Sequence, residues 1–408
     1  MDKIFDVIIV GAGPSGCACA ISLKDSGLKV ALLDKAVFPR EKTCGDGLTL
    51  DVVKQLPLIS EELFDEFCKL KSKRVIYGIK VYSTNHKSTT VSILQENEQR
   101  SMFTIKRVDF DNMFIEYIKH KTKIAIYEDC CLESIETKSD SIIVNTSNGV
   151  FRSSLIIGAD GADSLVAKYL RPCKLSDADK AIALRNYYEG VNLGDDSHFI
   201  KFYANIKMLP GGLWVFPVGD AMVNVGLGVQ SSVLNKKKIN LKDILEEEIN
   251  NGALKEAFIN AKPFDKLKGH IIPLGKRGRV ISGERFLLTG DAAGLANALS
   301  GEGIGNALRS GRVAAQHIIE GFEQGDFSKT FNLKYDKEIY RRMGREFYNY
   351  RLLQYLFRFP FIVNFLIGKV GPRCADFYNN PEFVARFQGK RFFVLRILKY
   401  IIFHKKVK

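Results

Sequence analysis

Short, continuous apolar runs recur along the chain, at residues 5–10 (FDVIIV), 29–33, 154–158 and 285–289. Runs of this length that are rich in Val, Ile and Leu are typical of strands buried on both faces of a parallel sheet. A glycine-containing loop and then a helical pattern follow three of them. This alternation predicts Rossmann-like α/β units with parallel strands.

The middle of the chain has a different pattern. Strand-like runs rich in Val, Ile, Phe and Tyr, with turn residues between them, occur at residues 73–83, 88–95, 181–190, 198–206 and 213–229. These runs predict a mostly antiparallel sheet, so the fold class is α/β within an α+β whole. We expect an α/β domain of residues 1–72, 100–172 and 270–325, an antiparallel-sheet domain of residues 73–99 and 173–269, and a helical C-terminal region of residues 326–408.

Composition and charge narrow the class of protein. The 408 residues are 46% hydrophobic and 26% charged, as in a globular chain, and the formal net charge is +14. Residues 331–408 hold 17 Lys and Arg against 5 Asp and Glu, so +12 of the +14 lies there. The longest apolar stretch in this part, residues 359–368, has ten residues. A membrane-spanning helix needs about 20, so we expect none.

The N-terminus and the cysteines indicate a cytoplasmic protein. The apolar run at residues 5–10 has no cationic flank and no small-residue cleavage site, so we expect no signal peptide. The eight cysteines include no CxxC pair and no His-Cys spacing for a metal, which predicts free thiols and no metal site.

A GxGxxG motif directly follows the first apolar run. Gly11 allows the tight turn, Gly13 lets the backbone approach a pyrophosphate, and Gly16 lets the next helix pack against the strand. The second predicted strand ends at Asp34, whose carboxylate is placed to accept from a ribose hydroxyl. Ser15 and Lys35 complete this site for the ADP half of a dinucleotide, which is FAD or NAD.

A second glycine-rich segment favours FAD. Gly290 and Asp291 close the strand at residues 285–289, which places a carboxylate where a ribityl hydroxyl could bond it. Backbone amides at Gly301, Gly303 and Ile304 would start the next helix and face the pyrimidine edge of a flavin. The alternative is a loop of small residues that serves packing alone.

With a third element, Asp160 and Gly161 after the strand at residues 154–158, the sequence resembles the superfamily of FAD-dependent hydroxylases and reductases. In that superfamily the early GxGxxG, a middle Asp-Gly and a late Gly-Asp build one FAD-binding domain. The resemblance implies that Asp160 and Gly161 lie near the pyrophosphate and that Arg107 contacts the flavin. Without a flavin, Arg107 would be an exposed charge at a helix start.

Two further stretches resemble the geranylgeranyl reductase family, which hydrogenates isoprenoid double bonds. One is residues 38–47 (FPREKTCGDG), and the other is residues 214–228, with a Trp-x-Phe-Pro block followed by Gly-x-Gly. The family has a Tyr where this chain has Gly212. The resemblance implies FAD, a prenyl lipid or other hydrophobic substrate, and a lipid cavity lined by Trp214, Phe216, Pro217, Gly226 and Gly228.

Cys44 and Asp46 are the candidate catalytic residues, and Cys44 and Gly45 are also candidates for flavin contact. Alkene reduction needs a hydride from reduced flavin, a nearby proton donor and exclusion of water. The Cys44 thiol is a weak acid that would need help from an ordered water or Asp46, and it is equally well interpreted as a packing residue. His198 and His270 are expected to be structural or surface residues.

Alternative functions and the electron donor stay open. The main alternative is an FAD-dependent monooxygenase that hydroxylates an aromatic or lipid substrate. A flavin halogenase is disfavoured because its two-Trp motif cannot exist in a chain with one Trp, and an electron-transfer relay lacks its cysteine cluster. The single dinucleotide motif is used by FAD, so the donor is NAD(P)H bound elsewhere, a reduced protein or a quinol.

The basic C-terminus contains two aromatic-rich candidate helices, at residues 341–359 and 392–408. They are interpreted either as helices resting on an anionic membrane surface or as a helical subdomain with a solvated basic face. No nucleic-acid-binding module accompanies the charge, so we expect no nucleic acid partner. The sequence thus predicts a cytoplasmic enzyme, and the first of these two interpretations would place it peripherally on the inner face of the membrane.

Overall fold

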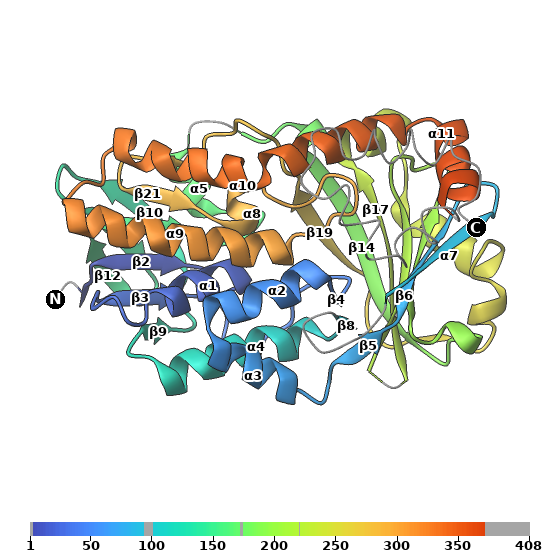
Figure 1. Ribbon diagram of the computed structural model, residues 1–408, viewed down its shortest axis with the longest axis horizontal. Helices are drawn as coiled ribbons and strands as arrows, with labels where there is room; N and C mark the ends of the chain where they lie inside the picture. Colours follow the sequence, from blue (N-terminus) through green and yellow to red (C-terminus); the bar gives the residue numbers. More distant parts are fainter. Residues whose placement is uncertain (1–2, 94–100, 172–173, 220, 372–408) are drawn as a thin grey trace, which may run out of the picture.

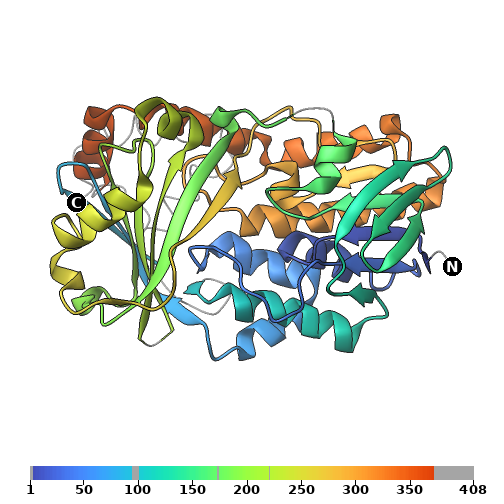
Figure 2. The same ribbon diagram turned by 180° about the vertical axis from the view of Figure 1, so that it is seen from behind.

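The computed structural model describes residues 3–93, 101–171, 174–219 and 221–371, and two halves lie side by side in it (Figure 1). One half contains the N-terminus and a parallel sheet with helices. The other is built around a large sheet with α7 (Leu241–Asn250) at its far end. A long helix, α10 (Lys329–Leu356), runs along one edge of both halves, as the reverse view also shows (Figure 2).

The first half is organised around a six-stranded sheet in the order β20-β21-β13-β2-β3-β9. Every residue of β2 (Val7–Val10), β3 (Val30–Leu33) and β13 (Leu155–Gly158) is buried, as the continuous apolar runs predict. β2 pairs in parallel with β3 and β13, and β13 pairs in parallel with β21 (Phe286–Leu288). β9 (Ala125–Tyr127) and β20 (Ser282–Gly283) complete the sheet. The predicted α/β domain is therefore assembled from distant segments.

Two helices that begin beside this sheet pack closely on one another. They are α1 (Pro14–Ser22) and α9 (Ile304–Gln324). A Cβ atom at Gly311 would lie 2.1 Å from the carbonyl oxygen of Ser15, so only glycine permits this approach. The contact brings the early and late glycine-rich motifs to the same end of the sheet.

Helices α2 (Leu50–Ile59) and α4 (Arg107–Lys121) pack beside α1 in this half, and α3 (Glu61–Lys69) packs against α2 and α4 (Figure 1). A four-stranded sheet that the sequence did not predict, in the order β1-β12-β11-β10, comprises β1 (Lys3–Ile4), β10 (Leu132–Thr137), β11 (Ile142–Thr146) and β12 (Gly149–Ser153). Its strands are short and partly polar, so their pattern was too weak to identify them. The short α5 (Leu165–Leu170) and α8 (Gly290–Ala293) follow β13 and β21.

The second half contains an eight-stranded, mostly antiparallel sheet in the order β18-β14-β17-β16-β15-β6-β7, with β19 also paired to β14. Its strands are β6 (Gly78–Tyr82), β7 (Ser88–Ser92), β14 (Lys180–Glu189), β15 (Phe199–Ala204), β16 (Gly212–Val218), β17 (Met222–Gln230), β18 (Lys262–Pro263) and β19 (Lys268–Pro273). One pair, β15 with β6, is parallel. The outer face is covered by α7 and by the short α6 (Ser231–Lys237).

Three sequence boundaries differ from the structure. The run at residues 73–83 forms two strands rather than one. The second is β6 of the large sheet, whereas the first, β5 (Arg74–Ile76), lies outside that sheet. β5 pairs with β8 (Met102–Thr104), which also pairs with β4 (Gly47–Leu48). The run at residues 213–229 is a hairpin of β16 and β17. Residue 270, the predicted start of the last α/β segment, lies within β19, which belongs to the large sheet.

The C-terminal region is helical over its described part, through α10 and α11 (Pro360–Phe365). The candidate helix at residues 341–359 falls almost entirely within α10, whereas residues 392–408 lie outside the described residues. Among the helices that the structure describes, none combines the length and the apolar character that crossing a membrane requires. The fold class predicted from the sequence is confirmed.

Candidate functional site

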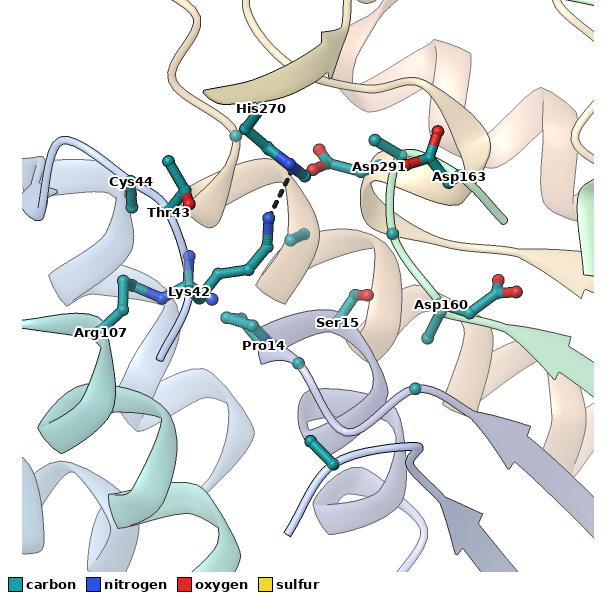
Figure 3. A pocket seen from close by; sticks show the side chains of 18 of the residues that line it. Pro14, Ser15, Lys42, Thr43, Cys44, Arg107, Asp160, Asp163, His270 and Asp291 are labelled. Carbon is teal, nitrogen blue, oxygen red and sulfur yellow. Dashed lines mark hydrogen bonds between the residues drawn. The ribbon is translucent and has the colours of Figure 1, made fainter. Parts of the chain in front are cut away.

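A cavity of about 690 Å³ lies between the α/β half and the large sheet. Figure 3 shows its walls, with Cys44 and Lys42 on one loop and Asp291 and His270 on other elements. Most of the predicted cofactor-binding residues line it: Gly11, Gly13, Ser15, Asp34, Lys35, Cys44, Gly45, Arg107, Asp160, Gly161, Asp291, Gly301, Gly303 and Ile304. The two that do not, Gly16 and Gly290, pack behind Gly11 and Ser15.

The nucleotide end of the cavity has the geometry that the GxGxxG motif predicts. Gly11 has φ +102°, and a Cβ atom there would lie 2.3 Å from the carbonyl oxygen of Ala159. α1 begins after Gly13 without a side-chain cap, so its first amides are available to an anion. The Asp34 carboxylate accepts hydrogen bonds from the amides of Ala12 (2.7 Å) and Ala36 (2.9 Å), which fix it on the cavity wall.

The two later acidic residues have different surroundings. The Asp160 carboxylate accepts hydrogen bonds from the Ser164 hydroxyl and from the Leu165 amide (2.7 Å), so it helps to begin α5. The Asp291 carboxylate accepts no hydrogen bond from the described residues and faces the cavity (Figure 3). Burial raises the pKa of Asp291, and the nearby cations Lys42 and Arg107 oppose this effect. Asp291 is therefore free to bind a ligand hydroxyl.

Arg107 is buried rather than exposed, and its counterion is one turn further along α4. Its Nε and Nη2 each donate to the Asp111 carboxylate at 2.7 Å. Burial lowers the pKa of Arg107, but Asp111 and the Cys44 side chain outweigh burial, so its pKa is raised. Asp111 also pairs with Arg40 at 3.0 Å. The sequence reasoning missed Asp111, although its i,i+4 spacing from Arg107 on a predicted helix was a usable signal.

The candidate catalytic residues lie on the loop before β4. Cys44 is half-buried, lines the cavity and lies beside Arg107. Asp46 is 0% exposed and lies behind the cavity wall, where its carboxylate accepts from Tyr187 Oη (2.5 Å) and Asn224 Nδ2 (2.8 Å). Asn224 also donates to the Cys44 carbonyl (2.8 Å). Asp46 is therefore placed to position the Cys44 loop, and direct contact with a ligand in the cavity would require movement.

Burial raises the pKa of Asp46 to about 6 from 3.8, against the hydrogen bonds from Tyr187 and Asn224, which lower it. The native state therefore retains a proton that the unfolded state releases, so stability from this group is present below pH 4 and is lost as the pH rises through 6. We predict that Asp46→Asn, whose side chain does not titrate, avoids this loss. Its free energy of unfolding relative to that of the wild type should therefore increase by about 3 kcal/mol between pH 4 and pH 7.

Urea unfolding of the wild type and of Asp46→Asn at both pH values measures the difference. The exposed Asp195→Asn serves as the control and is expected to show no such pH dependence. An equal difference between Asp46→Asn and the wild type at pH 4 and pH 7 would contradict the prediction.

Lys42 and His270 form a contact across the cavity that the sequence reasoning missed. Lys42 Nζ lies 2.5 Å from His270 Nε2 (Figure 3). Burial lowers the pKa of Lys42 to about 8 and that of His270 to about 4, so at neutral pH a protonated lysine donates to a neutral histidine. His270 was expected to be a structural or surface residue, but it lines the cavity from β19. Its position follows from strand pairing, which a lone His in the sequence does not reveal.

A second cavity of about 510 Å³ adjoins the first. Its walls are mainly apolar and come from β14 to β17 of the large sheet, from α10 and from the chain after α11. Four residues line both cavities: Ala183, Trp214, Ile272 and Gly301. Trp214 Nε1 donates to Asn224 Oδ1 at 2.9 Å, which fixes the indole at this junction.

The other predicted lipid-cavity residues have several positions. Gly228 lines the second cavity. Gly226 packs under Trp214, where a Cβ atom would lie 2.2 Å from the indole. Phe216 and Pro217 line neither cavity; Phe216 packs below Gly45 and Gly47, and the Pro217 carbonyl accepts from Thr104. Gly212, in place of the family's Tyr, lines the second cavity.

FAD fits the first cavity. A Cβ atom at Gly13 would meet no protein atom nearer than Arg40 Nη2 at 3.8 Å, so the space before α1 is open to a pyrophosphate. At the start of α9, Gly303 provides no side-chain cap, and the Asp291 carboxylate lies beside it without a hydrogen bond from the described residues; in the same turn the Glu302 carboxylate accepts from the Gly305 amide. These features define a flavin-binding oxidoreductase of the Rossmann-like class.

Comparison with known proteins confirms this class. Residues 179–262 match the geranylgeranyl reductase catalytic domain, and residues 5–145 match the pyridine nucleotide-disulphide oxidoreductase family. Digeranylgeranylglycerophospholipid reductase 2 of Methanosphaera stadtmanae is 27% identical over 364 residues, 85% of this chain and 85% of its own. Menaquinone reductase of Mycolicibacterium smegmatis is 27% identical over 330 residues, 79% of this chain and 78% of its own.

Solved structures agree with the fold. A geranylgeranyl bacteriochlorophyll reductase-like protein from Thermoplasma acidophilum has a TM-score of 0.78 at 20% identity and covers 98% of this chain and 99% of its own. A flavin-dependent brominase has a TM-score of 0.72 at 19% identity and covers 98% and 99%. The protein is an FAD-dependent oxidoreductase, and its resemblance to the geranylgeranyl reductase family is confirmed.

Proposed function

We propose that this protein hydrogenates carbon-carbon double bonds of a prenyl lipid. The observation that carries the proposal is the junction of two cavities at Trp214, one suited to FAD and the other apolar and large enough for a hydrocarbon chain. Gly13, Arg107 and Asp291 line the first cavity and would hold FAD there, and in its reduced form it would supply the hydride for one alkene carbon while the other carbon takes a proton. The apolar second cavity excludes water from the alkene.

Residues of this chain orient the alkene and donate the proton. Trp214, fixed by Asn224, forms the wall against which a prenyl chain passes from the second cavity to the first. The Cys44 thiol is the proton donor that we propose, since it lines the FAD cavity. Asp46 positions the Cys44 loop through Asn224, whose amide nitrogen donates to both the Asp46 carboxylate and the Cys44 carbonyl.

The test is anaerobic photoreduction of the bound flavin, followed by titration with prenyl lipids. Reoxidation of the flavin with a two-dalton gain in the lipid is the expected result. A sixteen-dalton gain that requires oxygen would instead support the alternative, a monooxygenase. No mass change with any prenyl lipid, in protein that holds FAD, would overturn the proposal.

The substrate and the electron donor can be specified further than the reaction class. The named relatives act on a glycerophospholipid and on menaquinone, so a prenyl tail is the feature that their substrates share. We propose NAD(P)H, a reduced protein or a quinol as donor, because the one dinucleotide motif serves FAD. Rates of flavin reduction by NADPH and by a quinol, measured anaerobically, distinguish these donors.

An aromatic surface beside the second cavity supports a peripheral membrane location. Tyr355, Phe359, Phe361 and Phe365 are exposed on α10 and α11 and in the turn between them, and Phe361 is 71% exposed. Residues Phe357, Leu366 and Ile367 of the same segment line the second cavity. We propose that this surface rests on an anionic membrane on the cytoplasmic side, so that a lipid enters the cavity directly.

We predict that Phe361→Ser weakens binding to vesicles that contain anionic lipid by about 5- to 10-fold, because an exposed aromatic ring contributes 1 kcal/mol or more of burial on insertion. Vesicle co-sedimentation measures the effect, and Val37→Ser, an exposed residue of the other half, is the control. Removal of residues 392–408 is also expected to weaken binding. Equal binding of Phe361→Ser and the wild type would contradict this prediction.

A further inference from the structure

The hydrogen bond between Lys42 and His270 joins the two halves of the molecule at the candidate FAD cavity. Lys42 belongs to the loop that also carries Cys44, whereas His270 belongs to β19 of the large sheet. Lys42 Nζ lies 2.5 Å from His270 Nε2, and both side chains line the cavity (Figure 3). The imidazole thus holds the lysine ammonium inside the cavity that Cys44 also lines.

The proton of this pair resides on the lysine. Burial lowers the pKa of His270 to about 4, and the Lys42 ammonium and Arg107 add to this effect. Burial lowers the pKa of Lys42 as well, but only to about 8. The charged or ionisable groups that act on the ammonium are Asp291, Arg107, Cys44 and Arg40. At neutral pH the imidazole therefore accepts a hydrogen bond from the ammonium without taking its proton.

A lysine with this pKa can give its proton to a thiolate. An ordinary thiol titrates at about 8.5, so the transfer is nearly isoenergetic, whereas an ordinary lysine, with a pKa of about 10.4, binds its proton more tightly by a factor of about 100. Arg107 also lies beside Cys44, but the Asp111 carboxylate accepts from its Nε and Nη2 and the pKa of Arg107 is raised. Arg107 therefore keeps its protons.

Alkene reduction creates a need for such a proton source. If the Cys44 thiol gives its proton to the alkene, its sulfur becomes a thiolate that must be protonated again before the next double bond is reduced. Asp46 does not line the cavity, and its carboxylate already accepts from Tyr187 and Asn224. Lys42 lines the same cavity as Cys44 and is close enough for the two side chains to interact electrostatically.

We propose that Lys42 returns a proton to Cys44 after each double bond is reduced, and that His270 is the positioning residue for the lysine ammonium. One N–H bond of the ammonium breaks and the S–H bond of the thiol forms. The neutral amine then takes a proton from solvent. This inference rests on the proposed function, because it supplies the proton which that reaction consumes.

The experiment uses FAD-loaded protein, dithionite as the reductant and geranylgeranyl diphosphate as the probe. With enzyme in excess, Lys42→Ala should reduce the first double bond at the wild-type rate, because Cys44 starts protonated. Its later turnovers should be about 100-fold slower, and added ethylammonium should restore them. Lys42→Arg keeps the positive charge but holds its proton too tightly to transfer it, so its later turnovers should also be slow.

Lys268→Ala is the matched control. Lys268 lies two residues before His270 on β19 and pairs with Glu41, the neighbour of Lys42, so it joins the same strand to the same loop. Its removal should leave every turnover at the wild-type rate. Equal slowing by Lys268→Ala, wild-type later turnovers in Lys42→Ala or Lys42→Arg, or no recovery with ethylammonium would overturn the proposal.

NMR of FAD-loaded protein with isotope-labelled histidine gives a readout that is independent of turnover. The His270 signal, assigned by its loss in His270→Gln, should show a neutral ring with the proton on Nδ1, because Nε2 accepts from Lys42. Lys42→Ala should change this signal and Lys268→Ala should not. A signal unchanged by Lys42→Ala would refute the inference alone, whereas no reduction of the probe by the wild type would refute the proposed function and the inference with it.

Discussion

Replacement of Gly13 by alanine is expected to leave the protein folded and to lower its affinity for FAD by about 10- to 100-fold. Gly13 has φ −77°, which alanine adopts without strain, and its added methyl group would meet no protein atom nearer than 3.8 Å. The methyl group would instead occupy the space before α1 that a pyrophosphate needs. Titration of apoprotein with FAD, followed by flavin fluorescence, measures the affinity.

Gly11 provides the contrasting variant. Gly11→Ala would place a methyl group 2.3 Å from the Ala159 carbonyl at φ +102°, so we expect it to destabilise the fold itself, by about 3 kcal/mol. Gly344→Ala on α10, where the added Cβ makes ordinary contacts from 3.4 Å, is the control and should bind FAD normally. Unchanged FAD affinity in Gly13→Ala would show that the pyrophosphate lies elsewhere.

Gly228→Phe is expected to slow the reduction of prenyl lipids strongly while FAD stays bound. A Cβ atom at Gly228 fits, with its nearest neighbours at 3.8 Å, and the phenyl ring would then occupy the second cavity. Excluding one five-carbon isoprene unit from an apolar site costs about 4 kcal/mol at 0.8 kcal/mol per carbon, so kcat/KM should decrease by about 100- to 1,000-fold.

The rate at which a prenyl lipid reoxidises photoreduced flavin measures this effect, and FAD content and photoreduction serve as internal controls. Gly228→Ala, which leaves most of the cavity open, should retain most of the activity. If Gly228→Phe reduced prenyl lipids at the wild-type rate, the second cavity would not be the substrate site.

Most of the candidate FAD site could be predicted because its motifs are local. Gly11, Gly13 and Asp34 follow strands whose apolar runs are unmistakable, and parallel strands bring their carboxyl ends to one edge of the sheet. Asp160 and Asp291 follow two further strands of the same sheet, so the same rule places them beside the first motif.

Other parts of the site were not predictable, since they depend on contacts between distant segments. His270 reaches Lys42 because β19 pairs with β14, and Asp46 is removed from the cavity by contacts with Tyr187 and Asn224. Phe216, from the Trp-x-Phe-Pro block, supports the Cys44 loop rather than lining a cavity. A strand pattern shows which side chains share a face, but it does not show what that face packs against.

The sequence by itself determined the α/β class, the flavin motifs and the resemblance to the geranylgeranyl reductase family, because these depend on short-range spacing and backbone geometry. Only the tertiary structure decided that an apolar cavity adjoins the candidate FAD cavity at Trp214 and that His270 lies beside Lys42 in the wall of the latter. Cavities and buried charges depend on how the large sheet packs against the α/β half and α10, and that packing depends on side chains far apart in the chain.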